Sequence, residues 1–334
     1  MLNARISFSS RKFVPLPQIE IVTPYSADAN NGNWRTAARW MRLLRGRCNV
    51  ILQSDWRPGR HAAGADCLIA LHARRSHAAI REWRERFPRR PLIVVLTGTD
   101  LYRDLPDNEE ARESVRHADR LIVLQEDALR FIDKAQRAKA RVVYQSARTL
   151  VPAVKARSRL NCILVGHLRP EKDPLTAIEA WSRLPAEEPV FLLHLGGALD
   201  RELGKFARAF ARQEPRYHWV GAMPHAWTRQ AIKRAHLLIL PSKMEGGANV
   251  VVEAVCAGTP VLGSHMSGNI GMLGADYAGY FPVGDGATLA ALLLQCSNDP
   301  SFYNRLASQC RSRSALFLPE RERSALLGVI RELV

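Results

Sequence analysis

Short apolar runs alternate with amphipathic segments along the first part of the chain. Runs such as 66–71 and 91–97 are apolar at nearly every position, which is typical of strands buried on both faces of a parallel sheet. The segments between them carry apolar residues three and four positions apart, the spacing of one helix face. This pattern predicts strands at 19–24, 49–53, 66–71, 91–97, 120–124 and 141–144, and helices at 34–45, 76–86, 109–117 and 126–135.

A basic segment without periodicity, 148–160, is followed by a second pattern of the same kind. It predicts strands at 162–166, 190–195, 217–221, 236–240, 259–263 and 280–283, helices at 174–184, 200–212, 227–234 and 249–257, and a helical tail from 287 to 334. Strands that alternate with helices predict a parallel sheet in each half.

The two patterns predict an α/β protein with two Rossmann-like domains that face a cleft, where ligands bind at the carboxyl ends of the strands. The expected parts are an N-terminal extension (1–18), a first Rossmann-like domain (19–155), a second Rossmann-like domain (156–312) and a final helix (313–334) that can pack back on the first domain. The extension has no continuous apolar region and no small-residue cleavage site, so we expect no secretion signal.

The chain carries 48 Lys and Arg residues against 32 Asp and Glu residues, a net charge of +16. Such a field attracts anions, namely nucleic acid, anionic lipid or phosphorylated small molecules, but no nucleic-acid motif accompanies the charge. Because Arg often stands beside Glu on the predicted helices, much of the charge is expected to form a solvated surface. No apolar stretch approaches the roughly 18 residues of a membrane helix, so no stable membrane insertion is expected. Six scattered cysteines without a C-x-x-C pair favour reduced thiols in a cytoplasmic protein. No Asp-x-Asp motif stands between the domains, and neither a metal nor a cofactor is expected.

Residues 240–262 are the most informative stretch. A strand ends near Pro241, the pair Gly246–Gly247 opens the next helix, and Glu245 and Glu253 stand eight positions apart. Free backbone N–H groups at a helix start can meet a diphosphate, and both carboxylates can accept hydrogen bonds from the hydroxyls of one ligand. The alternative is a capped helix with two exposed glutamates.

A second loop, 165–173, carries a lysine, Lys172, that is suited to a phosphate, together with His167 and Arg169. Its alternative is a basic surface turn before a helix. A third loop, 220–224, contains Gly221 and Met223.

In the first domain, the polar loop 30–33 precedes the first predicted helix, although Asn and Gly also form ordinary turns. His72 ends a strand on the cleft side, and a structural histidine is the alternative. Arg74, Arg75 and Arg103 lie beside the same strand ends, or else on the outer surface.

The 240–262 stretch resembles the E-x7-E signature of retaining GT-B glycosyltransferases, and the 165–173 loop resembles their G-R-x-x-x-x-K loop, with His167 in place of the arginine. The resemblance implies that Glu245 faces the sugar, that Glu253 holds the ribose and that Lys172 holds the diphosphate. Many members carry a histidine where this chain has Thr99. The implied donor-binding residues are Glu245, Gly246, Gly247, Ala248, Asn249, Glu253, His167, Gly221 and Met223.

Five segments together resemble the selenosugar synthases of selenoneine biosynthesis: 30–34, 71–76, 96–104, 166–174 and 272–285. This resemblance implies that selenophosphate attacks the sugar of UDP-N-acetylglucosamine or UDP-glucose, so that UDP is released and a carbon–selenium bond forms. The implied catalytic residues are Lys172, Arg169, Gly32, Asn33 and His72. The implied acceptor-binding residues are Asn31, Arg74, Arg75, Thr97, Thr99, Asp100 and Arg103.

A selenium nucleophile is already anionic near neutral pH and needs less help from a general base than a hydroxyl does, which fits Thr99 in place of a histidine. Three alternatives remain open from the sequence. They are a transferase that acts on a lipid or polysaccharide acceptor, a nucleotide-sugar epimerase, and a basic binding protein that has lost activity. The preferred sugar and the oligomeric state are also left open.

Overall fold

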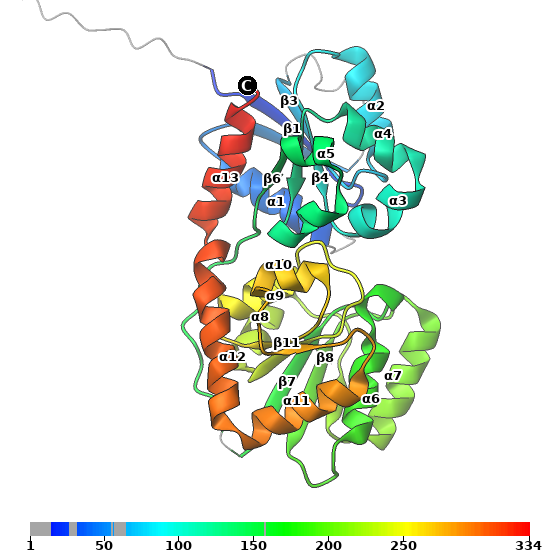
Figure 1. Cartoon of the computed structure of the whole chain (residues 1–334), viewed down its shortest axis with the longest axis vertical. Coiled ribbons are helices and arrows are strands. Elements are labelled where there is room, and N and C mark those ends of the chain that lie inside the picture. Colours follow the sequence, from blue (N-terminus) through cyan, green and yellow to red (C-terminus); the bar gives the residue numbers. More distant parts are fainter. Residues whose placement is uncertain (1–14, 27–31, 55, 57–64, 157) are drawn as a thin grey trace, which may run out of the picture.

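The computed structural model describes residues 15–26, 32–54, 56, 65–156 and 158–334. It contains two six-stranded parallel sheets, one in each half of the chain, with helices packed around them (Figure 1). The two-domain parallel-sheet fold predicted from the apolar runs is therefore confirmed.

The first sheet has the strand order β2-β1-β3-β4-β5-β6. Its central strands β3 (Cys67–Leu71) and β4 (Leu92–Leu96) are buried at every position, which explains their unbroken apolar sequence. The other strands are β1 (Gln18–Val22), β2 (Asn49–Gln53), β5 (Arg120–Val123) and β6 (Ala140–Val142). The helices of this half are α1 (Gly32–Leu44), α2 (His77–Arg86), α3 (Leu105–Asp107), α4 (Glu109–His117) and α5 (Lys134–Lys139).

The second sheet has the order β12-β11-β10-β7-β8-β9. Its strands are β7 (Leu160–Val165), β8 (Val190–Leu195), β9 (Tyr217–Trp219), β10 (Leu237–Leu240), β11 (Val261–Ser264) and β12 (Tyr280–Phe281). Its helices are α6 (Pro174–Arg183), α7 (Arg201–Gln213), α8 (His225–Arg234), α9 (Asn249–Val255), α10 (Ser267–Leu273) and α11 (Gly286–Asn298).

The prediction of one helix over 126–135 was wrong. The segment forms a 3-10 turn, η3 (Glu126–Phe131), and a separate helix α5. Ile132 between them has extended backbone and a buried side chain. Asp133 then caps α5: its carboxylate accepts from the Gln136 backbone N–H at 2.7 Å, and the Gln136 side chain accepts from the Asp133 N–H at 3.2 Å.

The tail is also interrupted, because α12 (Pro300–Arg313) and α13 (Pro319–Arg331) each begin at a proline, which cannot continue a preceding helix. Helix α12 lies along the second domain, and α13 runs back along the first (Figure 1). Leu326, Val329 and Ile330 of α13 join the core that α1 and the first sheet share. The chain thus crosses between the domains twice, once after β6 and once before α13.

Candidate active site

Loops that follow the strands of both sheets meet where the two domains touch. Tyr102, just after β4, lies with its hydroxyl 3.1 Å from the Ser267 hydroxyl at the start of α10. Gln125, just after β5, donates to the Tyr102 hydroxyl at 3.0 Å. These contacts bring the carboxyl ends of the two sheets together, which is where parallel-sheet proteins bind ligands.

Lys172 and Glu245 form an ion pair at this junction, with Nζ of the lysine donating to Oε1 of the glutamate. Ser242 donates a second hydrogen bond to the same oxygen at 2.7 Å. Lys172 belongs to the 3-10 turn η4 (Pro170–Lys172), which follows β7, and Glu245 belongs to the loop after β10. The structure therefore brings together the predicted phosphate lysine and the predicted sugar glutamate.

Glu253 is buried on α9, and its Oε1 atom lies 2.6 Å from Nε2 of His225. His225 is half-exposed at the start of α8, directly after the loop that carries Gly221 and Met223. Glu253, predicted to hold the ribose, is thus adjacent to the loop 220–224, which carries the predicted donor-binding residues Gly221 and Met223. His225 was not predicted, because the third candidate loop ended at residue 224. The position of His225 directly after that loop is the sequence signal that could have pointed to it.

Gly246 packs against the first domain. A Cβ atom at Gly246 would lie 2.1 Å from the carbonyl oxygen of Thr97, and one at Gly98 would lie 2.7 Å from the backbone nitrogen of Gly246. Gly98 also has a φ of +133°, which L side chains rarely adopt. A Cβ at Gly247 would contact Leu124 at 2.7 Å. The glycine pair therefore allows two backbones from different domains to meet, a role the sequence analysis did not foresee.

Ala248 precedes α9, which begins at Asn249. The side chain of Asn249 points to the first domain, because its Oδ1 atom accepts a hydrogen bond from Nη1 of Arg39 at 3.1 Å. A Cβ at Gly32, the first residue of α1, would lie 3.8 Å from Nδ2 of Asn249. The predicted donor-binding Asn249 therefore lies beside Gly32, which was predicted from the other domain; Asn33 follows it in α1, and Asn31 lies outside the described residues.

His167 occupies the position where the resembled family has arginine. Its Nδ1 atom accepts from the Gly197 N–H at 2.9 Å. Burial first, and then the charges of Arg169 and Lys172, lower the pKa of His167 below its ordinary value, against a smaller opposing effect of the Gly197 hydrogen bond. The imidazole is therefore neutral at neutral pH, and Lys172 and Arg169 supply the positive charge of this loop.

Arg169 is less constrained than its neighbours. Its Nε atom lies 4.0 Å from a carboxylate oxygen of Glu171, and two-fifths of the side chain is exposed. A guanidinium held this loosely retains donors for an anion.

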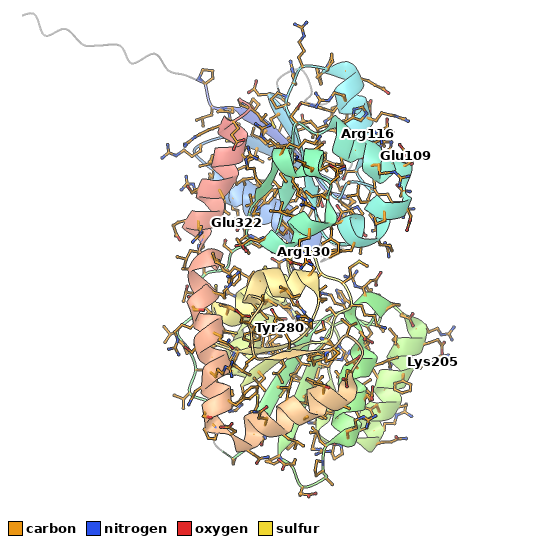
Figure 2. The ribbon with its side chains drawn as sticks, in the orientation of Figure 1. Glu109, Arg116, Arg130, Lys205, Tyr280 and Glu322 are labelled. Atoms are coloured by element: carbon orange, nitrogen blue, oxygen red, sulfur yellow. The ribbon has the colours of Figure 1, made fainter. Side chains whose placement is uncertain are left out.

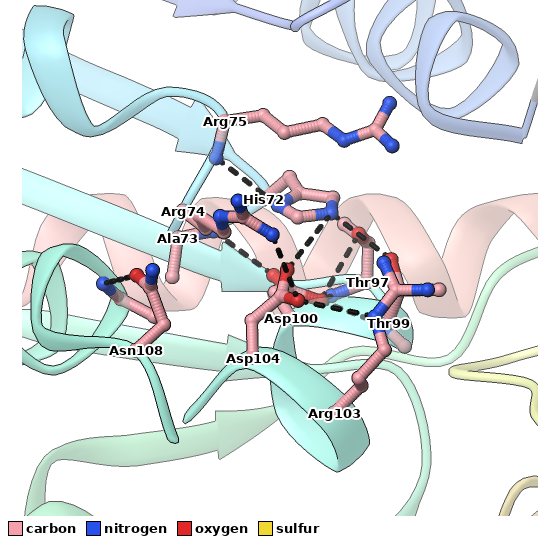
Figure 3. A network of polar contacts seen from close by, with 12 residues as sticks. His72, Ala73, Arg74, Arg75, Thr97, Thr99, Asp100, Arg103, Asp104 and Asn108 are labelled. Carbon is pink, nitrogen blue, oxygen red and sulfur yellow. Dashed lines mark hydrogen bonds and ion pairs between the residues drawn. The ribbon is translucent and has the colours of Figure 1, made fainter. Parts of the chain in front are cut away.

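Asp100 orders the loop around it. One carboxylate oxygen accepts from the backbone N–H groups of Thr97 and Gly98, each at 2.8 Å, and the other accepts from the Ala73 N–H at 2.9 Å. The residue is fully buried. Asp100, predicted to bind the acceptor, therefore has both oxygens engaged by the chain's own backbone, and Figure 3 shows it at the centre of this network.

His72 directly follows β3 and has a left-handed conformation with a φ of 74°. Its Nδ1 atom accepts from the Arg75 N–H at 3.3 Å, which places the ring proton of the neutral form on Nε2, 3.0 Å from the Thr99 hydroxyl. His72 is buried. Both ring nitrogens are thus occupied, and His72 and Thr99, 27 positions apart, form one contact.

Arg74 and Arg103 converge on one carboxylate (Figure 3), with distances to Oδ1 of Asp104 of 3.4 Å and 3.2 Å. Arg103 also reaches Glu171 of the second domain at 3.2 Å. Both guanidinium groups remain about half-exposed. Arg75 points away from this cluster, with its guanidinium 5.0 Å from the centre of the Tyr25 ring. Arg74 and Arg103 thus lie at the junction, while Arg75 stands apart from them.

Among the described residues, no group of three or more His, Cys, Asp and Glu side chains could hold a metal ion. No helix within the described ranges is long and apolar enough to cross a membrane. A cavity of about 390 Å³ opens between β7, β8, β9 and α8, but none of the predicted site residues lines it.

Comparison with solved structures identifies the fold as GT-B. The chain is similar to sucrose-phosphate synthase from Thermosynechococcus elongatus, with 16% identity, a TM-score of 0.77, and coverage of 95% of this chain and 99% of that chain. It is also similar to Anabaena HepE in complex with UDP-glucose, with 16% identity, a TM-score of 0.75, and coverage of 95% and 100%. At these identities the likeness shows the fold, and the GT-B architecture predicted from the sequence is confirmed.

Residues 154–313 match the model of the glycosyl transferases group 1 family. The matched segment contains the second sheet, Lys172, Glu245 and Glu253. The family match and the GT-B fold together support a glycosyltransferase.

Proposed function

We propose that the protein is a UDP-sugar-dependent glycosyltransferase that uses selenophosphate as its nucleophile. The donor is UDP-N-acetylglucosamine or UDP-glucose, and the products are UDP and a sugar whose anomeric carbon carries the selenium, which keeps its bond to the phosphoryl group in this step. The observation that carries this proposal is the set of side chains around Thr99 and Asp104 in the first domain. Arg74 and Arg103 are partly exposed there, whereas His72 and Asp100 are already engaged in hydrogen bonds within the domain.

The donor half of the proposal rests on the second domain. Lys172 and Glu245 meet at the end of β7 and β10, and Glu253 lies beside the loop that precedes α8. A lysine suits a phosphate as a point charge, and buried carboxylates suit sugar hydroxyls. Anabaena HepE, which shares the fold, has been solved in complex with UDP-glucose. A nucleoside-diphosphate sugar is the ligand that uses all three side chains.

The acceptor half rests on how the two side chains nearest to Thr99, His72 and Asp100, are already engaged. Both carboxylate oxygens of Asp100 accept hydrogen bonds from backbone N–H groups, and Nδ1 of His72 accepts from the Arg75 N–H. A sugar hydroxyl needs a positioned base to lose its proton, whereas selenophosphate is ionised in advance. Arg74 and Arg103 pair with Asp104, and Arg103 also reaches Glu171, which Arg169 approaches from the other side. Three arginines thus stand against two carboxylates, which leaves positive charge for a phosphorylated acceptor.

In the proposed reaction the selenium atom attacks the anomeric carbon, a carbon–selenium bond forms, and the bond from that carbon to the UDP oxygen breaks. UDP leaves with the electron pair. Lys172 and Arg169 stabilise the charge that grows on the leaving diphosphate, an effect that is often the largest in such reactions. The acceptor's phosphoryl group faces the arginines of the first domain.

The test is UDP release from purified protein with UDP-N-acetylglucosamine, with and without selenophosphate. We expect release to depend on selenophosphate and a selenium-containing sugar to appear in the mass spectrum. Inorganic phosphate serves as a matched anionic control that lacks selenium. Equal release with water alone, or release that requires a lipid or polysaccharide acceptor, would refute the selenosugar proposal while leaving a UDP-sugar glycosyltransferase.

A further inference from the structure

We propose that Arg39, held by the buried carboxylate of Glu322, is a positioning residue that fixes the donor helix α9 through Asn249 and so sets the closed arrangement of the two domains. The inference rests on the proposed glycosyltransferase function, because it names what aligns the two halves of that site. None of the three residues is required to touch a substrate.

Glu322 lies on α13 where that helix passes the junction between the domains (Figure 2). Its carboxylate accepts from Nε of Arg39 at 2.9 Å, from Nε1 of Trp40 at 2.7 Å and from the Ser146 N–H at 2.9 Å. The Ser146 hydroxyl donates as well. Glu322 is only 1% exposed. A buried carboxylate is tolerated when it is paired and its lone pairs are satisfied, and Glu322 meets both conditions.

Glu322 therefore joins three segments that are distant in sequence. Arg39 and Trp40 belong to α1, Ser146 belongs to the first crossing between the domains, and Glu322 belongs to the helix that returns after the second crossing. Because Nε of Arg39 is bound to this carboxylate, the far end of the guanidinium has a fixed direction.

The far end of Arg39 reaches the other domain. Its Nη1 atom donates to Oδ1 of Asn249 at 3.1 Å, and the arginine side chain is only 15% exposed. Asn249 begins α9, three residues after Gly246, and α9 also carries Glu253. The Arg39 side chain thus connects Glu322 of α13 to α9, the helix that carries Asn249 and Glu253.

This contact requires the domains to be close. The Gly246 backbone lies against Thr97 and Gly98 of the first domain, where even a Cβ would not fit. Asn249 stands three residues after Gly246, and its hydrogen bond with Arg39 spans the same junction. The bond therefore forms when the Gly246 backbone approaches the first domain. Separating the domains would break the bond, whereas the bonds from Glu322 to Trp40 and Ser146 would survive, since these residues do not belong to the second sheet or its helices.

The test uses Asn249→Ala, Arg39→Lys and the double variant. Asn249→Ala removes the hydrogen bond between Asn249 and Arg39 but leaves the Arg39–Glu322 pair intact, so we expect the fold to be preserved. Arg39→Lys keeps a positive charge for Glu322 but loses the fork that spans both partners. Arg42→Ala is the matched control, because Arg42 is exposed one turn further along α1.

We expect each single variant to lower kcat about tenfold and to change the KM for the UDP-sugar less than threefold, with the double variant no worse than the worse single one. Effects that multiply in the double variant would overturn the proposal. So would a raised donor KM at unchanged kcat in Asn249→Ala, because that result marks Asn249 as a plain ligand contact.

A second readout needs no acceptor. Arg116 on α4 and Lys205 on α7 are exposed in different domains (Figure 2), and the six native cysteines are all buried, so cysteines at 116 and 205 can be labelled selectively. With UDP bound, we expect one short label distance in the parent protein and an added longer distance in Asn249→Ala. An unchanged distance distribution would overturn the proposal. A changed distribution without selenophosphate-dependent transfer would instead overturn the proposed acceptor alone.

Discussion

Lys172 and Glu245 form an ion pair although they stand 73 positions apart in the chain. One comes from the loop after β7 and the other from the loop after β10, which are adjacent strands of the second sheet. Neither side chain is more than one-fifth exposed, so each charge depends on the other. Under the proposed function, a bound diphosphate would compete with Glu245 for Lys172, and the sugar hydroxyls would then bond to Glu245. The ion pair would thereby link binding of the diphosphate to binding of the sugar.

Replacement of Lys172 by alanine is expected to lower kcat on the order of 100-fold, because the charge on departing UDP loses its fixed cation. Single-turnover kinetics with UDP-N-acetylglucosamine and selenophosphate measure the effect. Lys205→Ala serves as the control, since Lys205 is exposed on α7, where it pairs with Glu202. A Lys172→Ala enzyme with parent kcat would remove Lys172 from the catalytic role.

Replacement of Glu253 by alanine is expected to weaken UDP binding roughly 10- to 100-fold, since hydrogen bonds to a charged group are worth about 1.5–3 kcal/mol. Titration calorimetry with UDP reports the affinity. His225→Ala is the informative companion: it removes the residue now bonded to Glu253. That variant should bind UDP at least as tightly as the parent. Unchanged UDP affinity in Glu253→Ala would contradict the ribose assignment.

A methyl group at Gly246 is expected to keep the domains apart, because it would lie 2.1 Å from the Thr97 carbonyl oxygen. Gly246→Ala should therefore lose at least tenfold in kcat while the thermal unfolding of the protein changes little. Gly328→Ala is a matched control within α13, where an added Cβ meets nothing within 4 Å. It should leave activity intact and raise stability by up to ~1 kcal/mol. Full activity in Gly246→Ala would show that the close approach is dispensable.

The stability of the fold is expected to fall as the pH drops below about 6.5, where unfolded histidines take up protons. Burial lowers the pKa of His194 to about 4, and this ring contacts the Tyr217 hydroxyl at 2.7 Å and the Gly166 carbonyl at 3.1 Å. Between these two pH values the unfolded state binds a proton that the folded state does not, so acid favours unfolding. The loss is complete below pH 4.

At pH 5 the contribution of His194 to this loss is about 2 kcal/mol. Urea unfolding at pH 7.5 and pH 5 measures it. His194→Gln should be less stable at pH 7.5 and lose less stability on acidification. An equal loss in the variant and the parent would assign the pH dependence to other groups, of which His167 and His236 also have pKa values lowered first by burial.

The apolar runs predicted the strands of both sheets. The signal was strongest at strands such as β3 and β4, because burial at every position leaves little choice of residue. The glycine pair and the two glutamates were visible for a similar reason, as a strand–loop–helix pattern has a local signature. The helix over 126–135 failed because a buried Ile132 and a capping Asp133 interrupt an otherwise periodic segment.

Roles that depend on the opposite partner could not be predicted. An aspartate before a helix suits an acceptor or a backbone cap equally, and only the fold brings the Ala73, Thr97 and Gly98 N–H groups to Asp100. Glu322 has an unremarkable place in an amphipathic helix, and its burial follows from the return of α13 across 283 positions of sequence to Arg39. Such pairs become visible only when both crossings between the domains are known.

The most direct test of the account is the identity of the atom attached to the anomeric carbon of the product. Carbon-13 and selenium-77 NMR of the product from labelled UDP-N-acetylglucosamine and selenophosphate distinguishes the outcomes. We expect direct coupling between the anomeric carbon and selenium, with UDP formed in equal amount. A free sugar from hydrolysis, or a sugar joined through an oxygen of the acceptor, would contradict it.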